Sequence, residues 1–403
     1  FMGEDPYLAS SMDVPYIQGM QSNGVSACVK HFALNNDEEN RFNVNVVVSD
    51  RALHEIYLPA FEAAVKKGHA WAIMGSYNLY KDEHNCHNEY LLNRILKQDW
   101  QFDGVVVSDW GGVHNTEQAV KNGLDMEFGT WTNGLTTGTK NAYDNYYLAD
   151  PYLKGISDGT YTMKELNDKV RRVLRLFFRT TMAPDRGHGF LCSEAHYATA
   201  RNVGDEGIVL LQNKGDVLPL KVHKIRKVLV VGENAIKMMT VGGGSSSLKV
   251  QKEISPLSGL EKALREYNPD LSVEFERGYV GDTTGSYNGV TTGQSLVDHR
   301  SSGELIAAAV AKARTADAVI LFGGLNKSDH QDCEGHDRLT YDLPYDQNKL
   351  IEALSRANKN FVFVNISGNA VAMPWKTQVP AIVQAWYLGS EAGDAIADVI
   401  TGK

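Results

Sequence analysis

Short apolar runs alternate with helical patterns along the first 180 residues, and this alternation restricts the folds that the chain can adopt. The clearest predicted strands are VSACVKHF (25–32), AWAIMGSYN (70–78) and GVVVSDW (104–110). Between them, residues 51–68 and 88–100 place apolar side chains at the spacing of amphipathic helices. This alternation predicts parallel strands joined by crossover helices. Both a β/α barrel and a doubly wound sheet fit, and the pattern alone does not separate them.

Each of these predicted strands ends in polar side chains that can take part in chemistry. Lys30 and His31 end the first strand, Tyr77 and Asn78 end the second, and Asp109 ends the third. Because parallel strands present their carboxyl ends at one edge of a sheet or barrel, these side chains are expected to gather there. A carboxylate directly after a buried apolar run must be either held by hydrogen bonds or kept for chemistry.

A second strand and helix alternation follows the turn-rich segment 180–194. Its predicted strands cover 227–233, 271–278, 317–324, 360–368 and 381–387, with helical patterns at 256–268 and 303–315. This order predicts a three-layer α/β sandwich with a mainly parallel sheet. The Gly-, Ser- and Thr-rich stretch from 278 to 302 is expected to be a long surface loop.

We therefore expect a barrel domain over 1–180, a linker over 181–192 and a sandwich domain over 193–403. The composition supports folded domains, since 43% of the 403 residues are hydrophobic. Forty basic against 49 acidic residues leave a formal charge of −9, without a basic stripe for phosphates. No apolar run approaches the roughly 20 residues that cross a bilayer. Neither nucleic acid nor a membrane is an expected partner.

The cysteines and histidines give little sign of a metal site. The four cysteines, Cys28, Cys86, Cys192 and Cys333, are widely separated and form no CxxC pair, which argues against a disulfide framework or a cysteine zinc site. The sequence HNCH, with His84, Cys86 and His87, is the nearest approach to a metal motif. Two histidines three residues apart need further ligands, so a polar loop is the favoured interpretation and no metal is expected.

Eight segments, taken together and in order, resemble the glycoside hydrolase family 3 β-glucosidases. They are FMGEDPYLAS, GMQSNGVSACVKHFALNNDEENR, MGSYN, DGVVVSDWGG, EGIVLLQNKGDVLPL, VGGGSSS, CEGHDRLTYDLPYDQ and AWYLGSEAGDAIADVITG. Each is a weak match alone, but their common order over nearly the whole chain argues against coincidence. The resemblance implies a partial (β/α)8-type barrel followed by the α/β sandwich, and a periplasmic or extracellular location, although the first residues lack the regions of a signal peptide.

In that family the aspartate of the SDW segment is the nucleophile, and the resemblance assigns this role to Asp109. A retaining glycosidase needs an ionised carboxylate that attacks the anomeric carbon and forms a glycosyl ester. From the residues alone, Asp109 could instead cap the next helix, because Trp110, Gly111 and Gly112 begin a turn.

The resemblance places the second carboxylate, the acid/base, at Glu334 in the segment CEGHDR. It must lie about 5 to 5.5 Å from the nucleophile in a retaining enzyme, so the site is expected to form across the domain interface. By itself Glu334 is one acid in a charged loop and could be solvated or paired with Arg338. Asp332 and Asp337 are its local competitors.

Further residues match positions that bind the sugar at subsite −1 in relatives. Charged donors serve sugar hydroxyls well, Tyr77 matches a residue that contacts nucleophile and sugar, and Trp110 matches a flanking ring. The assigned residues are Lys30, His31, Arg41, Tyr77, Trp110 and Ser245. VGGGSSS, which carries Ser245, lacks the ending of a phosphate loop and the spacing of a dinucleotide fingerprint. Without the resemblance, Lys30 and His31 could simply be polar residues at the surface, and Tyr77 could be a packing residue at a strand end.

The chain also departs from the family pattern at both ends. Relatives begin well before the GEDP segment and usually continue beyond ITGK, so we expect a fragment without the early barrel strands and the C-terminal domain. A half barrel exposes strand edges and apolar surface. The isolated chain is therefore expected to be impaired or inactive, and to form a homo-oligomer or require the rest of the barrel.

The leading interpretation is a retaining exo-acting β-glucosidase that acts on oligosaccharides or glycosides by double displacement, without a cofactor. A β-xylosidase uses the same carboxylates, and a catalytically impaired carbohydrate-binding fragment would keep the fold without the reaction. A β-N-acetylhexosaminidase is disfavoured because KHFALNNDEE stands where those relatives have KHFPGHG. A metal hydrolase is the remaining alternative.

Overall fold

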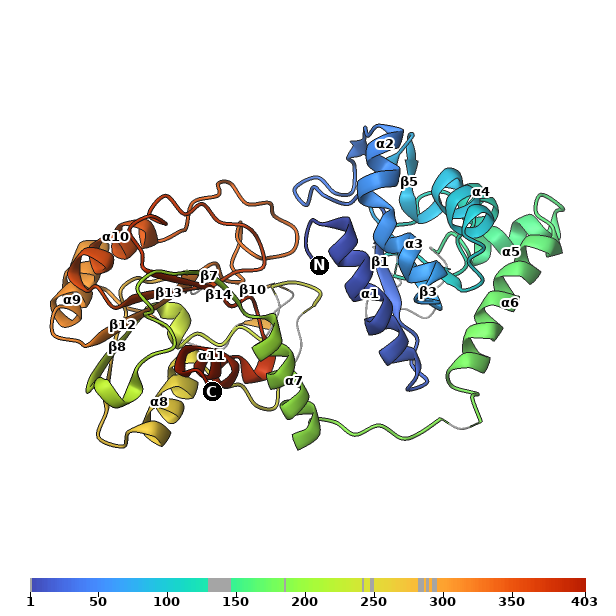
Figure 1. Ribbon diagram of the computed structural model, residues 1–403. Coiled ribbons are helices and arrows are strands. Elements are labelled where there is room, and N and C mark those ends of the chain that lie inside the picture. The colour runs from blue at the N-terminus through green and yellow to red at the C-terminus, as the bar shows by residue number, and fades with distance from the viewer. Residues whose placement is uncertain are drawn as a thin grey trace. The chain divides into compact units, whose positions relative to one another are not determined.

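The computed structural model describes residues 2–129, 146–184, 186–240, 243–246, 250–281, 286–287, 290–291 and 296–403. The chain divides into two compact units, Phe1–Gly189 (unit 1) and Phe190–Lys403 (unit 2). Unit 1 contains helices α1 to α6 and unit 2 contains α7 to α11 (Figure 1). Each unit has its own hydrophobic core, so each is described by itself.

Unit 1 is built on a parallel sheet of order β1-β3-β6, which spans Cys28–Phe32, Ala72–Gly75 and Val105–Val107. These strands lie within the three runs predicted from the sequence. The three valines of β6 are at most 5% exposed, as expected of a strand covered on both faces. A smaller sheet, β2-β4-β5, contains Asn45–Val46, Leu79–Tyr80 and Glu83–His84.

The helices of unit 1 follow the predicted alternation. They are α1 (Pro6–Gln21), α2 (Asp50–Ala52), a π-helical segment (Leu53–Tyr57), α3 (Pro59–Lys66), a second π-helical segment (Tyr90–Asp99), α4 (Thr116–Lys121), α5 (Asp150–Ser157) and α6 (Met163–Arg179). The helical patterns at 51–68 and 88–100 are confirmed. Leu53, Leu92 and Leu96 are fully buried and pack with Phe32 and Val106 of the sheet, so these helices cover the strands that deliver the candidate residues.

Unit 2 is built on a six-stranded sheet of order β7-β14-β13-β12-β8-β9. The strands are β7 (Val209–Asn213), β8 (Lys227–Val231), β9 (Ser272–Glu276), β12 (Ala318–Gly324), β13 (Phe361–Ile366) and β14 (Ala381–Gln384). All neighbours pair in parallel except β7, which pairs antiparallel with β14 at the edge. The five predicted strands are confirmed, whereas β7 is an additional strand.

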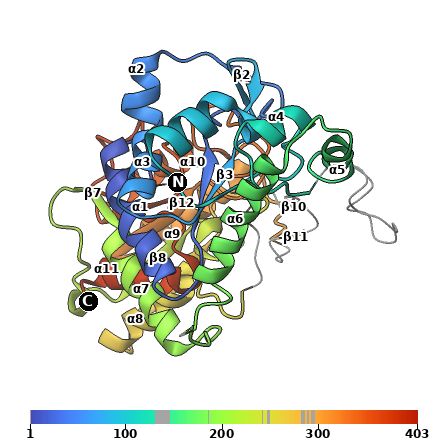
Figure 2. The same ribbon diagram turned by 90° about the vertical axis from the view of Figure 1, so that its right-hand side faces the viewer.

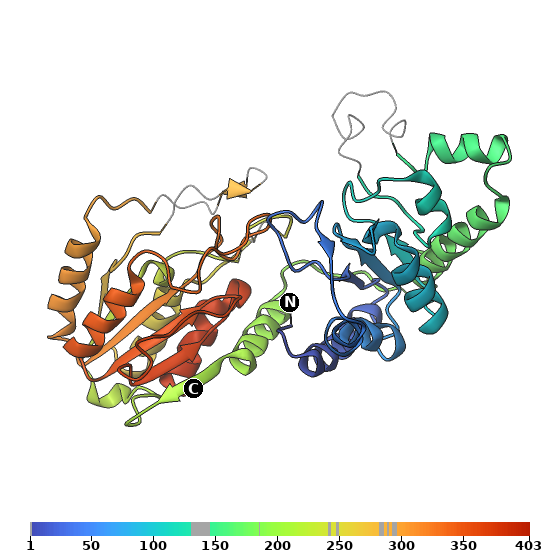
Figure 3. The same ribbon diagram turned by 90° about the horizontal axis from the view of Figure 1, so that it is seen from above.

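Helices cover both faces of this sheet, which gives three layers (Figures 1 and 3). One core joins alternate strand residues to α8 (Pro256–Tyr267) and α11 (Ala392–Thr401), and the other joins the remaining strand residues to α9 (Ser302–Ala313) and α10 (Gln347–Ala357). Val228 and Val230 point into the first core, and Leu229 and Val231 into the second. This alternation is the period of a strand buried on both sides.

The remaining segments differ little from expectation. Helix α7 (Glu194–Gly207) begins at Ser193, whose hydroxyl accepts the His196 N–H. The stretch 278–302, expected as a loop, contains the short paired strands β10 (Ser286–Tyr287) and β11 (Val290–Thr291) (Figure 2). Within the described ranges, every helix falls short of the length or the apolarity needed to cross a membrane.

Candidate active site

Asp109 lies just beyond β6, where a tight turn surrounds its carboxylate. The Trp110 N–H donates to Asp109 Oδ1 at 2.8 Å, and the Gly112 N–H donates to the Asp109 carbonyl at 3.1 Å. The residue is only 6% exposed. Asp109 does not cap the next helix, because the side chain of Asn115 accepts the Gln118 N–H at the start of α4. The carboxylate is therefore held in place and remains available for chemistry.

A buried thiol lies beneath this turn. The Asp109 N–H donates to Cys86 Sγ at 3.4 Å, and the thiol faces the Ser76 carbonyl at 3.4 Å. Burial raises the pKa of Cys86 to about 12, so the group stays a neutral thiol. A Cβ at Gly112 would lie 2.6 Å from Sγ, so the turn can approach the thiol only with glycine at that position. Cys86 thus supports the Asp109 turn.

Two predicted sugar-binding residues gather at Asp109. His31 on β1 places Nε2 3.4 Å from Asp109 Oδ2. The Tyr77 hydroxyl donates to the Trp110 carbonyl at 2.9 Å and also contacts the Asp109 carboxylate. Burial, followed by the charge of Asp109, raises the pKa of Tyr77, so its hydroxyl remains a donor. The Arg41 guanidinium lies 4.9 Å from the centre of the Tyr77 ring.

Lys30 and Trp110 complete the set predicted for unit 1. Lys30 precedes His31 on β1 with an exposed side chain. Trp110 is 50% exposed and stacks on Phe128, with ring centres 5.1 Å apart and planes 30° apart. A tryptophan that is supported on one side and open to solvent can act as a platform for the apolar face of a sugar ring.

Three histidines, His84, His87 and His114, form a cluster next to Tyr77. His84 Nδ1 lies 3.0 Å from the Tyr77 carbonyl, and the His114 ring stacks on His84 with centres 3.8 Å apart. The His114 N–H donates to His87 Nε2 at 3.1 Å. Burial lowers the pKa of His87 to about 3, and burial with the neighbouring His84 lowers the pKa of His114 to about 4. His87 and His114 are therefore neutral at pH 7, and the three histidines join the loops after β3 and β6.

The sequence favoured a polar loop for His84, Cys86 and His87, with a metal site as the weaker alternative. In the described part of the chain these three do not bring donor atoms within 4.8 Å of one another. Cys86 instead supports the Asp109 turn, and His87 accepts a backbone N–H. His114 was missed, because it lies 27 positions beyond His87 and no local pattern links the two.

Glu334 of unit 2 lies at a topological switch point of the six-stranded sheet. From β8 the chain continues to β9 on one side and returns through β12 on the other, and ligands of open α/β sheets bind outside the carboxyl ends at such points. Glu334 belongs to the loop after β12, and Gly243 to Ser246 follow β8. The predicted acid/base Glu334 and the predicted sugar-binding residue Ser245 thus come from loops after adjacent strands.

The loop after β8 holds Glu334 through its backbone. The Ser245 N–H donates to Glu334 Oε2 at 2.6 Å, and the Glu334 N–H donates to the Gly243 carbonyl at 2.8 Å. A Cβ at Gly244 would lie 2.4 Å from the Glu334 Cβ. Arg338, considered as an ion-pair partner, donates to the carbonyls of Ala370 and Thr340. Ser245 therefore contacts Glu334 by its amide.

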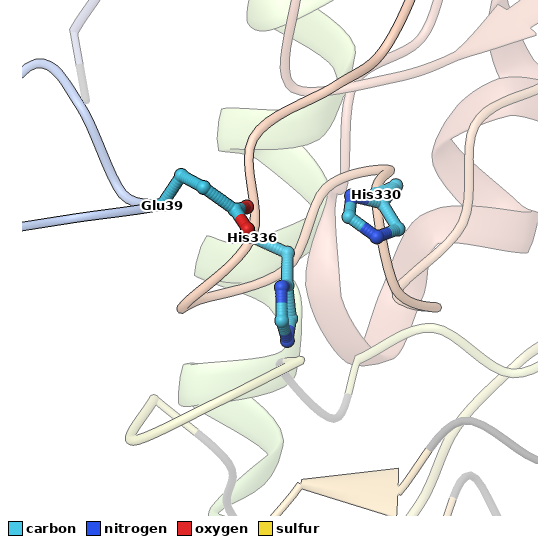
Figure 4. Close-up of side chains that lie close together, drawn as sticks. All are labelled: Glu39, His330 and His336. Carbon is cyan, nitrogen blue, oxygen red and sulfur yellow. The ribbon is translucent and has the colours of Figure 1, made fainter.

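The same loop carries two histidines that the sequence analysis did not single out. The rings of His330 and His336 have centres 5.0 Å apart (Figure 4). His330 Nδ1 lies 2.9 Å from the Asp337 carbonyl, which favours the proton on Nδ1. The pair adds two imidazoles to the loop of Glu334.

The structure thus brings the predicted residues together in two groups. His31, Arg41, Tyr77, Asp109 and Trp110 lie around the end of β6 in unit 1, with Lys30 on β1. Ser245 and Glu334 are in contact in unit 2. Each group lies where parallel strands end in its own sheet, which is where a two-domain α/β protein places its reactive residues.

Comparison with known proteins identifies the family to which the chain belongs. The model described as Glycosyl hydrolase family 3 N terminal domain matches residues 2–176, and the Glycosyl hydrolase family 3 C-terminal domain matches residues 208–403. The chain belongs to glycosyl hydrolase family 3, and the expected fold class, a barrel-type domain followed by an α/β sandwich, is confirmed.

Individual relatives agree with this family. A β-glucosidase of Bacteroides ovatus is 51% identical over 408 residues, which cover all of this chain and 53% of the relative. An exo-α-(1→6)-L-arabinopyranosidase of Bifidobacterium longum is 33% identical over 413 residues, covering all of this chain and 49% of the relative. The crystal structure of a β-glucosidase from Bifidobacterium adolescentis is 33% identical, with a TM-score of 0.80 over 99% of this chain and 53% of that one. The chain spans about half the length of the curated relatives it matches.

Proposed function

We propose that the chain supplies the catalytic carboxylates of a retaining, exo-acting β-glucosidase that acts on terminal sugars of oligosaccharides or glycosides. The observation that carries this proposal is the Asp109 carboxylate, which is buried at the end of β6 and oriented by the Trp110 N–H, with His31 and Tyr77 beside it. The β-glucosidase from Bacteroides ovatus, at 51% identity, supports the substrate class.

The first chemical step forms a covalent intermediate. Asp109 attacks the anomeric carbon of the terminal sugar, while the Glu334 carboxylic acid gives its proton to the glycosidic oxygen. The bond from the anomeric carbon to that oxygen breaks, and the aglycone leaves as an alcohol. The sugar remains as an ester of Asp109. The fixed turn after β6 suits this role, because a nucleophile must be held in line with the bond that breaks.

The second step returns the enzyme to its starting state. Glu334, now a carboxylate, takes a proton from water as the water oxygen attacks the anomeric carbon. The ester bond to Asp109 breaks, the sugar leaves with retained configuration, and Glu334 is again an acid. No cofactor takes part in either step. Two inversions give net retention, which is the measurable stereochemical outcome.

The surrounding residues are proposed to bind the sugar. Lys30, His31 and Arg41 would donate hydrogen bonds to the hydroxyls at subsite −1, and Trp110 would stack against the ring. We also propose that Ser245 helps to hold Glu334, and that the chain divides into domains 1–180 and 193–403 joined by a linker at 181–192.

A mechanism-based inhibitor tests the assignment of Asp109. A 2-deoxy-2-fluoro-β-glucoside with an activated leaving group slows hydrolysis of the ester, so the glycosyl enzyme accumulates. We expect a mass increase of one fluorosugar on the peptide that contains Asp109, with none in Asp109→Asn. The test should use the full reading frame that contains residues 1–403. Sugar binding without labelling would indicate the carbohydrate-binding alternative, and labelling elsewhere would refute the assignment.

A pentosidase is the second candidate, because one relative is named as an exo-α-(1→6)-L-arabinopyranosidase. Xylose and L-arabinopyranose both lack the hydroxymethyl group (C6) that glucose carries on C5, and the same two carboxylates can act on all three. Comparing kcat/KM for 4-nitrophenyl β-glucoside, β-xyloside and α-L-arabinopyranoside decides between them. We expect the glucoside to be preferred, and a higher value for either pentoside would reassign the substrate.

A further inference from the structure

The loop that carries Glu334 is anchored by another acid, Asp332, two residues earlier in the chain. Asp332 Oδ2 accepts the Gly368 N–H at 2.7 Å and the Tyr387 hydroxyl at 2.7 Å. Asp332 Oδ1 accepts Asn369 Nδ2 at 2.7 Å. Both carboxylate oxygens are therefore bound by donors. The Asp332 side chain is therefore occupied by hydrogen bonds within unit 2. This argues against Asp332 as the acid/base, for which the sequence left it as a competitor of Glu334.

The partners of Asp332 come from the carboxyl ends of neighbouring strands. Gly368 and Asn369 follow β13, and Tyr387 follows β14, whereas Asp332 belongs to the loop after β12. These three strands are adjacent in the sheet. The Asp332 carboxylate thus connects the loop after β12 to the loops after β13 and β14. Glu334 lies in the same loop after β12, two residues beyond Asp332.

Tyr387 is itself fixed in a state that can donate. Lys327 Nζ lies 3.6 Å from the centre of the Tyr387 ring, a cation–π contact. Burial raises the pKa of Tyr387 well above its usual value, so the hydroxyl keeps its proton at neutral pH. The Tyr387 hydroxyl can therefore donate its hydrogen bond to Asp332 at neutral pH.

The loop after β8 packs on the other side of the same segment. A Cβ built at Gly243 would lie 2.7 Å from the Lys327 carbonyl and 3.2 Å from the Asp332 carbonyl. The neighbouring backbone of this loop binds Glu334 through the Gly243 carbonyl and the Ser245 N–H. The Asp332 segment thus lies between its anchors after β13 and β14 and the loop that holds the Glu334 carboxylate.

We propose that Asp332 is a positioning residue that sets the location of the Glu334 carboxyl group for proton transfer. This inference rests on the proposed acid/base role of Glu334. The charge and the two acceptor oxygens matter, because an asparagine would direct its NH₂ group at one of the three donors that Asp332 accepts. The loop would then shift while the six-stranded sheet beneath it stays intact.

The test compares leaving groups in four variants, Asp332→Asn, Tyr387→Phe, Asp317→Asn and Glu334→Gln. Asp317 is the matched control, because it precedes β12 and accepts the N–H groups of Arg226 and Lys227 at the opposite end of the same strand. Each variant is assayed with an activated 2,4-dinitrophenyl glucoside and with an alkyl glucoside whose departure requires protonation. Thermal unfolding is measured in parallel.

For Asp332→Asn we expect kcat/KM to fall about 10- to 100-fold on the alkyl glucoside and less than about threefold on the activated one, within the range of general acid catalysis. Tyr387→Phe removes one of the three donors and should give a smaller loss of the same selectivity. Asp317→Asn should show no dependence on the leaving group. Azide should accelerate turnover of the activated substrate by Asp332→Asn and yield a glycosyl azide.

The outcomes distinguish a failure of the positioning role of Asp332 from a failure of the acid/base role of Glu334. If Glu334→Gln loses activity equally on both substrates, the acid/base assignment fails. If Glu334→Gln is selective but Asp332→Asn and Tyr387→Phe lose activity equally on both substrates, only the positioning role of Asp332 is overturned. If Asp332→Asn does not fold, the selectivity of Tyr387→Phe decides the question in the same way.

Discussion

The two carboxylates proposed for the chemistry are held in contrasting ways. Asp109 of unit 1 lies two residues after β6 and is oriented by the backbone of its own turn and by the Cys86 thiol, which accepts its N–H. Glu334 of unit 2 lies in the loop between β12 and α10, and a separate loop after β8 binds its carboxylate and its amide. The first group is fixed by local structure, and the second depends on contacts between loops.

This contrast agrees with the two proposed roles. A nucleophile forms and breaks a bond to one carbon atom, so a rigid site at a strand end favours it. An acid/base gains and loses a proton in each cycle and meets both an aglycone and a water molecule. A loop that is hydrogen-bonded to the loops after several neighbouring strands can hold such a group and still leave space for different leaving groups.

The largest effect is expected from a substitution of Asp109 in unit 1. Asp109→Asn should lower kcat by about 10⁴-fold or more with every leaving group, because the neutral amide cannot form the glycosyl ester. Asp103→Asn is the matched control, since Asp103 lies before the other end of β6 and pairs with Arg179 at the surface. Steady-state kinetics with two aryl glucosides measure both. Near-normal turnover by Asp109→Asn would end the assignment.

The next largest effect is expected from a substitution in the loop after β8, which holds Glu334 in unit 2. Gly244→Ala places a methyl group 2.4 Å from the Glu334 Cβ, which should displace the acid/base and lower kcat/KM about 100-fold for glucosides with poor leaving groups. Gly303→Ala is the control, because nothing lies within 4 Å of a Cβ there. Full activity of Gly244→Ala would show that Glu334 tolerates movement of this loop.

The sequence predicted the unit 1 site better than the unit 2 site for a physical reason. A buried apolar run that ends in Asp109 is a local signal, and parallel strands bring His31 and Tyr77 to the same edge. The anchoring of Glu334 depends on contacts that no local pattern encodes, such as the Tyr387 hydroxyl on Asp332, 55 positions away. The family resemblance could supply the identity of Glu334 but not the contacts that hold it.

Two histidines of unit 1, His87 and His114, should make the stability of this unit depend on pH. His87 and His114 have pKa values lowered to about 3 and about 4 from 6.5, so between pH 6.5 and these values the unfolded chain binds protons that the folded chain does not. Stability of unit 1 should therefore fall as pH falls through this window, by about 1.4 kcal/mol per pH unit for the buried His87 and by less for His114, which is exposed and screened by solvent. Among the described residues, unit 2 has no histidine as buried as His87, which is 1% exposed.

His87→Gln removes one of these titrations and keeps an acceptor for the His114 N–H. The variant should lose less stability than the parent between pH 7 and pH 5, by about 2 kcal/mol. Urea unfolding at the two pH values measures the difference, and the exposed His223→Asn in unit 2 serves as control. Equal pH slopes for parent and His87→Gln would mean that the buried histidine titrates normally.

The smallest effect concerns the thiol under the nucleophile. Cys86→Ala removes the acceptor of the Asp109 N–H and leaves a gap beside Gly112, so kcat/KM should fall about tenfold, which corresponds to about 1.4 kcal/mol of transition-state stabilisation. The loss should be equal for good and poor leaving groups, because Cys86 acts on Asp109 and not on Glu334. This pattern is the opposite of the one expected for Gly244→Ala.

Cys86→Ser sharpens this test, because its hydroxyl restores an acceptor for the Asp109 N–H in nearly the same volume. Cys86→Ser should therefore recover most of the activity that Cys86→Ala loses, while the surface variant Cys192→Ala stays unchanged. If the alanine and serine variants are equally impaired, the thiol acts by filling space and not through the hydrogen bond. If both are fully active, the turn after β6 holds Asp109 without help from below, and the site in unit 1 is even more locally determined than the contacts suggest.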